Sequence, residues 1–88
     1  MNERVLILYG RRGCHLCDDM AAALEPRMVS RGIRLETVDV DTDPELKARF
    51  GWDVPLLFEG EFEICRYELD AVALEAWFNA GLHILAER

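Results

Sequence analysis

Apolar residues along this chain fall into blocks whose spacing alternates between that of strands and that of helices. The first block, residues 4–9, is a continuous run of strand-forming side chains: Val5, Leu6, Ile7, Leu8 and Tyr9. Such a run is typical of a strand that is covered on both faces, as in a parallel sheet. It predicts a first strand in the interior of the fold.

A helical spacing follows once residues 10–13 have interrupted the run. Apolar side chains then recur at i, i+3, i+4, i+7 and i+11, namely Cys17, Met20, Ala21, Leu24 and Met28. This stripe predicts an amphipathic helix that begins at the Cys14 turn. Pro26 conflicts with it, because its ring clashes with the carbonyl of Ala22 and one backbone hydrogen bond is lost. We therefore expect a kink or an early end near Leu24.

Residues 33–40 have the composition of a second strand, so the predicted helix connects two strands in a βαβ unit with a parallel pair. A short helix over 44–50 comes next. Asp43 supplies its N-cap, Pro44 suits its first turn, and Gly51 is a C-terminal stop.

Two further strands, at 54–58 and 62–67, flank a Glu-Gly-Glu turn and predict a hairpin. Pro55 is tolerated there because it begins its strand. Asp70 caps a last helix. The order strand, helix, strand, helix, strand, strand, helix predicts an α/β domain whose sheet is at least partly parallel.

Length and composition limit the class of protein. The 88 residues fit a single domain, 1–88, with no room for a second core. No run of ~18 apolar residues occurs and the start lacks the pattern of a secretory signal, so we expect a cytoplasmic monomer with no membrane partner. The net charge of -7 disfavours nucleic acid as a partner.

The three cysteines are too few for a disulfide framework, and their odd number leaves one unpaired. Two of them form the segment Cys14-His15-Leu16-Cys17, between the first strand and the first helix, where such a pair indicates redox chemistry. Residues three apart on a helical turn have Cβ atoms ~5–6 Å apart, close to the ~3.8 Å of a disulfide. The pair is therefore predicted to open and close without refolding.

The two cysteines are predicted to differ in role. Cys14 lies at the helix start, where free N–H groups and the helix dipole favour an anion, so it is our attacking thiolate. Cys17 lies on the apolar stripe and is expected to be the buried, resolving thiol. Nearby Arg11, Arg12 and His15 would favour the thiolate, whereas the two aspartates after the second cysteine would oppose it.

Residues 9–17 and the later Val-Pro pair resemble the glutaredoxin and thioredoxin-like superfamily, over nearly the whole chain. The resemblance implies a three-layer fold with a mixed four-stranded sheet and a cis peptide bond before Pro55. It also implies a thiol-disulfide oxidoreductase, in which the backbone before Pro55 pairs with an extended substrate. The expected partner is a disulfide-containing protein or a low-molecular-weight thiol. Our candidates for substrate contact are Arg11, His15, Val54 and Pro55.

The chain departs from the superfamily at positions that concern glutathione. Asp53 stands where glutathione-using members usually carry threonine, and residues 64–70 lack the paired glycines that help to hold glutathione. The Cys-His-Leu-Cys centre also differs from the common Cys-Pro-Tyr-Cys. We therefore predict a divergent glutaredoxin-like branch, with glutathione as an alternative co-substrate and no other cofactor.

Two other interpretations are open. One is a non-catalytic binding or accessory module that keeps the fold with idle cysteines. The other is metal or iron–sulfur cluster binding. A structural zinc site needs four ligands, and only Cys65, His15 or His83 could complete one here, so we predict no metal site. Cys65 is expected to pack as a small apolar residue.

Two smaller features also carry alternatives. Asp39, Asp41 and Asp43 alternate like the start of a calcium loop, but Pro44 occupies the required glycine position. They are better interpreted as strand-end and cap residues. Trp52 forms either an aromatic lip near the Val-Pro pair or a cover over the edge of the core.

Overall fold

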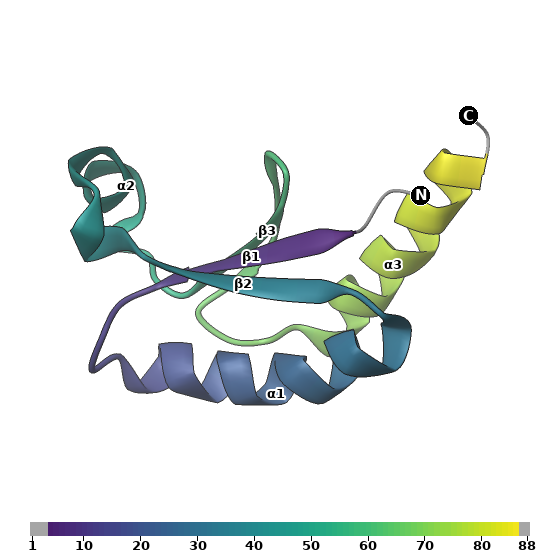
Figure 1. The fold of residues 1–88 in the computed structure, drawn as a ribbon, viewed down its shortest axis with the longest axis horizontal. Helices are drawn as coiled ribbons and strands as arrows, with labels where there is room; N and C mark the ends of the chain where they lie inside the picture. Colours follow the sequence, from purple (N-terminus) through teal and green to yellow (C-terminus); the bar gives the residue numbers. More distant parts are fainter. Residues whose placement is uncertain (1–3, 87–88) are drawn as a thin grey trace.

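The computed structural model of the protein describes the backbone of residues 4–86 and the side chains of residues 4–80. A four-stranded sheet has helices on both faces (Figure 1). In chain order the elements are β1 (Val5–Gly10), α1 (His15–Arg31), β2 (Arg34–Asp39), the 3-10 helix η1 (Val40–Thr42), α2 (Pro44–Phe50), β3 (Leu56–Glu59), β4 (Phe62–Arg66) and α3 (Ala71–Ala86). This confirms the predicted order and adds η1, which was not predicted. None of the described helices is long and apolar enough to cross a membrane.

The strands lie in the order β2-β1-β3-β4. β1 is parallel to β2 and antiparallel to β3, and β3 is antiparallel to β4, so the sheet is mixed as expected. Tyr9 pairs with Leu56 across β1 and β3. The loop after β1 and the segment before β3 therefore meet at the same end of the sheet. Pro55 lies just before β3, which begins two residues later than the predicted strand 54–58.

α1 runs through Pro26 to its end at Arg31, so the expected early end near Leu24 is wrong. Pro26 lies on the exposed side of the helix, whereas Met28, two residues later, is buried in the core. Full burial of a methionine contributes about 1.5–3 kcal/mol, which is of the same order as the ~3 kcal/mol cost of an internal proline. Packing beyond the proline therefore keeps the chain helical. Gly32, with φ 66°, forms the C-cap.

The two faces of the sheet are covered unequally. α1 and α3 cover one face, whose core consists of Leu6, Leu8, Met20, Leu24, Met28, Ile33, Leu57, Leu74 and Phe78. α2 lies on the other side of the sheet, over one end of it (Figure 1), in a smaller cluster of Val40, Phe50, Leu56 and Phe58. Val5, Ile7 and Tyr9 face that side and are only half-buried. The prediction that β1 is covered on both faces is thus wrong for this face, because α2 is too short to cover its full length.

Three aspartates cap helices of the fold. Asp43 accepts a hydrogen bond from the Glu45 N–H at 2.8 Å at the start of α2, and Asp70 accepts one from the Ala73 N–H at 2.9 Å at the start of α3. Asp39 caps η1 in the same way. These bonds confirm the interpretation as strand-end and cap residues for Asp39 and Asp43, whereas Asp41 lies within η1 and pairs with Arg11. No group of three or more metal-binding side chains occurs within the described part of the chain.

Glu59, at the end of β3, connects three parts of the fold. Its Oε1 lies 2.6 Å from Arg4 Nη2, before β1, and accepts a hydrogen bond from Trp77 Nε1 of α3 at 2.8 Å. The hydrogen bond from Arg4 lowers the pKa of Glu59 from its ordinary value, and the bond from Trp77 acts in the same direction. The carboxylate is therefore more stable in the folded state than in the unfolded chain.

Replacing Glu59 with glutamine is expected to lower the free energy of unfolding by about 1 kcal/mol at pH 7, a value reduced for its partial exposure. Because the folded-state pKa lies below the ordinary 4.5, the stabilisation is complete above that pH and is lost as the pH falls through the folded-state pKa. Urea unfolding of the wild type and the variant at pH 7 and pH 3 measures the difference between their free energies of unfolding. Glu61→Gln, in the adjacent turn, is the control. A gap of the same size at both pH values would contradict the assignment.

Candidate active site

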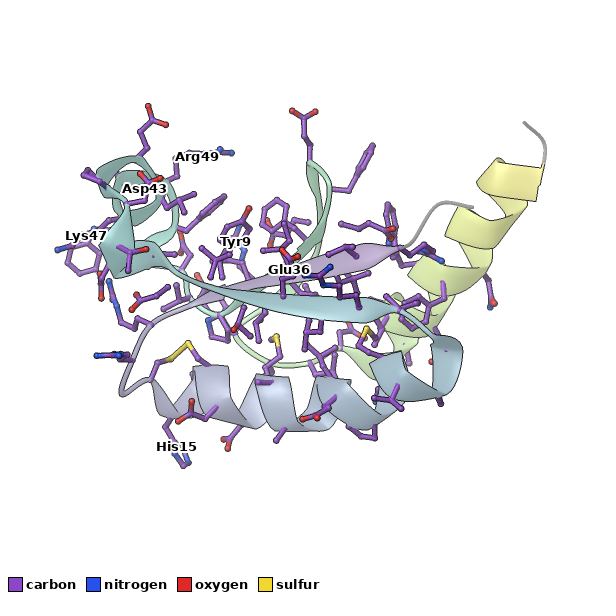
Figure 2. The ribbon with its side chains drawn as sticks, in the orientation of Figure 1. Tyr9, His15, Glu36, Asp43, Lys47 and Arg49 are labelled. Atoms are coloured by element: carbon purple, nitrogen blue, oxygen red, sulfur yellow. A yellow bond between two sulfur atoms is a disulfide. The ribbon has the colours of Figure 1, made fainter. Side chains whose placement is uncertain are left out.

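Cys14 and Cys17 are joined by a disulfide at the start of α1. The bond is visible as the yellow link between the helix and the loop after β1 (Figure 2). The two Cα atoms are 5.2 Å apart. Cys14 is the N-cap residue of α1, and its Sγ accepts a hydrogen bond from the Cys17 N–H at 3.1 Å. In the reduced protein this N–H donor and the helix dipole would stabilise a thiolate at the leading sulfur.

The two sulfurs differ in exposure as predicted. Cys17 is 6% exposed and belongs to the buried face of α1, whereas Cys14 is half-buried. Gly10, the last residue of β1, lies directly against the Cys17 side chain. A Cβ added to Gly10 would come within 3.0 Å of Cys17 Sγ and 3.2 Å of its Cβ. The sequence analysis did not assign this role to Gly10, although a glycine that ends an apolar strand is a signal for close approach.

The Val54–Pro55 peptide bond is cis, which confirms the expectation from the resemblance. The antiparallel register pairs Tyr9 with Leu56, so Pro55 and Gly10, the residue on which the Cys17 side chain packs, each adjoin this pair. The sheet therefore brings the Val-Pro segment and the two cysteines to one end of the domain. Pro55 is buried, and Val54 is half-buried against the smaller core cluster.

The Arg11 side chain forms hydrogen bonds with η1 and with the residue that follows α2. Its Nε and Nη2 donate to the Asp41 carboxylate at 3.1 and 2.8 Å, and its Nη1 donates to the Gly51 carbonyl at 2.9 Å. The hydrogen bond from Arg11 lowers the pKa of Asp41. Arg11 thus ties the loop before Cys14 to η1 and to the end of α2. Three of its five N–H donors are used in this way, and its contact with substrate stays a prediction.

His15 points away from the sheet at the start of α1 (Figure 2). Its side chain is 90% exposed, and its Nε2 lies 3.6 Å from Asp19 Oδ2 on the next turn. The disulfide lies on the opposite side of the helix, between α1 and the sheet (Figure 2). A direct contact between His15 and the substrate therefore also stays a prediction.

Tyr67 is a site residue that the sequence analysis missed. Its N–H donates to the Pro55 carbonyl at 2.8 Å, and its hydroxyl donates to Asp53 Oδ1 at 2.6 Å. Tyr67 has φ 69°, a left-handed conformation that glycine adopts without steric cost. The tyrosine therefore has a glycine-like backbone within the segment where paired glycines were noted as missing. Tyr67 thus connects the segment after β4 to Pro55 and to the residue that precedes the Val-Pro pair.

Three large apolar side chains near this end of the domain are exposed. Trp52, just before the Val-Pro segment, is 94% exposed, so it does not cover the edge of the core. Leu16 in the first turn of α1 is 46% exposed, and Tyr67 is 43% exposed. Exposed apolar groups that gather around one site are typical of a surface that contacts a partner molecule.

Cys65 lies apart from this arrangement. It is a free, half-buried thiol in β4, and it packs against the larger core cluster, as expected for a small apolar residue. Burial raises the pKa of this thiol from its ordinary value, so it is a poor nucleophile near neutral pH. The side chain of His83 lies outside the described residues.

The mixed sheet, its helices and the cysteine pair at the start of α1 define a thioredoxin-like protein of the glutaredoxin type. Residues 5–79 match the family model of the Glutaredoxin-like domain (DUF836). The chain therefore belongs to the Glutaredoxin-like domain (DUF836) family. No curated protein sequence matches it.

Solved structures agree with this assignment. Protein Ne2328 from Nitrosomonas europaea is 35% identical, with a TM-score of 0.75, and the match covers 88% of this chain and 93% of the other. Target protein XcR50 from X. campestris is 36% identical with a TM-score of 0.67, covering 85% and 96%. The glutaredoxin of Brucella melitensis is 26% identical with a TM-score of 0.53, covering 91% and 85%.

Replacing Gly10 with alanine is expected to destabilise the reduced protein by about 1–3 kcal/mol, because the added methyl group needs the space of the Cys17 side chain. In a Cys17→Ala background the cost should be smaller, since the sulfur is absent. Urea unfolding of the four proteins of this double-mutant cycle, under a reducing agent, measures the coupling. A cost that is unchanged in the Cys17→Ala background would show that Gly10 does not hold the sulfur.

Proposed function

We propose that this protein is a thiol-disulfide oxidoreductase in which Cys14 and Cys17 exchange with the disulfide of a substrate. The observation that carries the proposal is the disulfide at the start of α1, in which the leading sulfur accepts an N–H and the following one is buried. Membership of a glutaredoxin-like family supports it. A surface histidine or a core cysteine alone would support no such chemistry.

The proposed reaction begins with the reduced protein. The thiolate of Cys14 attacks one sulfur of the substrate disulfide, a mixed disulfide forms, and the other substrate sulfur leaves as a thiolate that takes up a proton. The thiolate of Cys17 then attacks Cys14 Sγ and releases the second substrate thiol. Two electrons pass from the dithiol to the substrate, and a low-molecular-weight thiol or a protein dithiol returns them.

The surroundings of the cysteines have separate parts in this proposal. The backbone of Val54, beside the cis bond, pairs with an extended substrate segment. Pro55 is buried and holds the Val-Pro segment of the protein at the end of the sheet near Gly10. Arg11 fixes the loop before Cys14 through its bonds to η1 and α2. The substrate is a protein disulfide or a mixed disulfide of a low-molecular-weight thiol such as glutathione.

Cys17→Ser is expected to accumulate the mixed disulfide with a peptide substrate, because no thiol is present to resolve it. Intact mass spectrometry measures the adduct. Cys14→Ser should lower the rate of disulfide reduction to that of the uncatalysed reaction, because the attacking sulfur is gone. Cys65→Ala, which removes a thiol away from the site, is the control and should keep the wild-type rate. Reduction by Cys14→Ser at the wild-type rate would overturn the mechanism.

A further inference from the structure

A groove lies between α1 and the segment after β4, and its lining includes Leu16, which stands between the two cysteines in the chain. It has a volume of about 250 Å³ and is lined by Leu16, Asp19, Met20, Ala23, Tyr67, Glu68 and Leu69. Most of this lining is apolar. The groups charged at neutral pH are two carboxylates, one from α1 and one from the segment after β4, and none of these lining residues is cationic. The groove is thus apolar with a negative rim.

Two cationic side chains near the groove, those of Arg66 and His15, have carboxylate partners. Arg66 makes two hydrogen bonds to Glu63, at 2.5 and 2.6 Å, and its Nη1 lies 3.5 Å from Asp53. His15 stands 3.6 Å from Asp19 and is 90% exposed, so a protonated imidazole there is well solvated. The two carboxylates in the lining of the groove are therefore the charges that an occupant of the groove would meet there.

The opposite side of α1 differs in its charge balance. A second groove there reaches Cys17 and carries Arg11 and Arg12 together with Asp18 and Asp39. Two cations and two anions leave this groove with no net charge. Of these two grooves, the one beside Tyr67 is the one whose charged lining residues all have the same sign.

The walls of the groove beside Tyr67 are held in place next to the redox centre. The backbone of Tyr67 is bonded to Pro55, and its hydroxyl is bonded to Asp53. Leu16, on the facing wall, lies between the two cysteines in the chain. A polypeptide whose cysteine reacts with Cys14 would bring the residues next to that cysteine over this groove.

We propose that this groove docks a substrate polypeptide that carries a lysine or arginine beside its reacting cysteine. This assignment rests on the proposed function and names its substrate class. The aliphatic stem of the cationic side chain packs against Leu16 and Tyr67, and its charged end approaches Asp19 and Glu68. Glutathione carries two carboxylates and one ammonium group, so its net negative charge disfavours it here.

The experiment compares four disulfide substrates of the reduced protein. Three are short peptides with lysine, glutamine or glutamate on both sides of one cysteine, each linked to the same reporter thiol, and the fourth is glutathione linked to that thiol. We expect kcat/KM to be about fivefold higher for the lysine peptide than for the glutamate peptide at low ionic strength, with the glutamine peptide between them. The ratio should fall in high salt, because exposed charges are screened.

Two double variants with equal charge change locate the effect. Asp19→Asn with Glu68→Gln should bring the lysine-to-glutamate ratio close to one, while the glutamine peptide is still reduced. Glu25→Gln with Glu45→Gln removes two exposed carboxylates elsewhere, and it should keep the wild-type ratio. If the lysine-to-glutamate ratio falls equally in both double variants, the preference comes from the charge of the whole molecule, and the assignment of the groove as the docking site is overturned.

Other outcomes distinguish a failure of the groove assignment from a failure of the proposed oxidoreductase function. Equal rates for the lysine and glutamate peptides, or faster reduction of the glutathione substrate than of the lysine peptide, would overturn the groove assignment and leave the oxidoreductase standing. Failure to reduce any of the four substrates would instead overturn the proposed function on which it rests.

Discussion

The contact between Gly10 and Cys17 is the constraint on which the rest of the site depends. The last residue of β1 has no side chain, and the sulfur of the first turn of α1 occupies that space. Because Gly10 and Pro55 both adjoin the Tyr9–Leu56 pair of the sheet, this contact sets how deep the helix start sits against the Val-Pro segment. A larger residue would push the first turn outward and carry Cys14 with it. The helix-capping sulfur is therefore placed by a packing contact.

Local signals explain which parts of the fold could be predicted. The bounds of α2, Pro44–Phe50, follow from an aspartate cap and a proline at its start and a glycine directly after its end. The segment around Pro26 shows the limit, because the local cost of the proline is offset by Met28 in a core formed by distant residues. The half-open face of β1 has the same origin, since an apolar run does not reveal how long the covering helix is.

The features of the candidate site likewise divide into those that local sequence predicts and those that depend on distant residues. The difference between Cys14 and Cys17 was predictable, because both the helix dipole and the apolar stripe are properties of consecutive residues. The anchoring bonds were not, since Arg11 and Asp41 are 30 residues apart and the Asp53–Tyr67 pair spans 14. Such bonds depend on the sheet order and on loop conformations that no short spacing encodes. The missing glycines marked the position of the tyrosine but not its partner.

In the proposed reaction, the groups that set the reactivity of the sulfur differ from those that select the substrate. The N–H donor to Cys14 and the burial of Cys17 come from the backbone and the inner face of α1. The charges that meet an incoming molecule come from the outer side of α1 and from the segment after β4. Because these groups are different, replacing Glu68 changes the field that a substrate crosses while the hydrogen bond to the leading sulfur stays in place. Relatives with the same fold and cysteine pair can therefore differ in substrate through a few surface charges, and the acidic rim of this chain is one such choice.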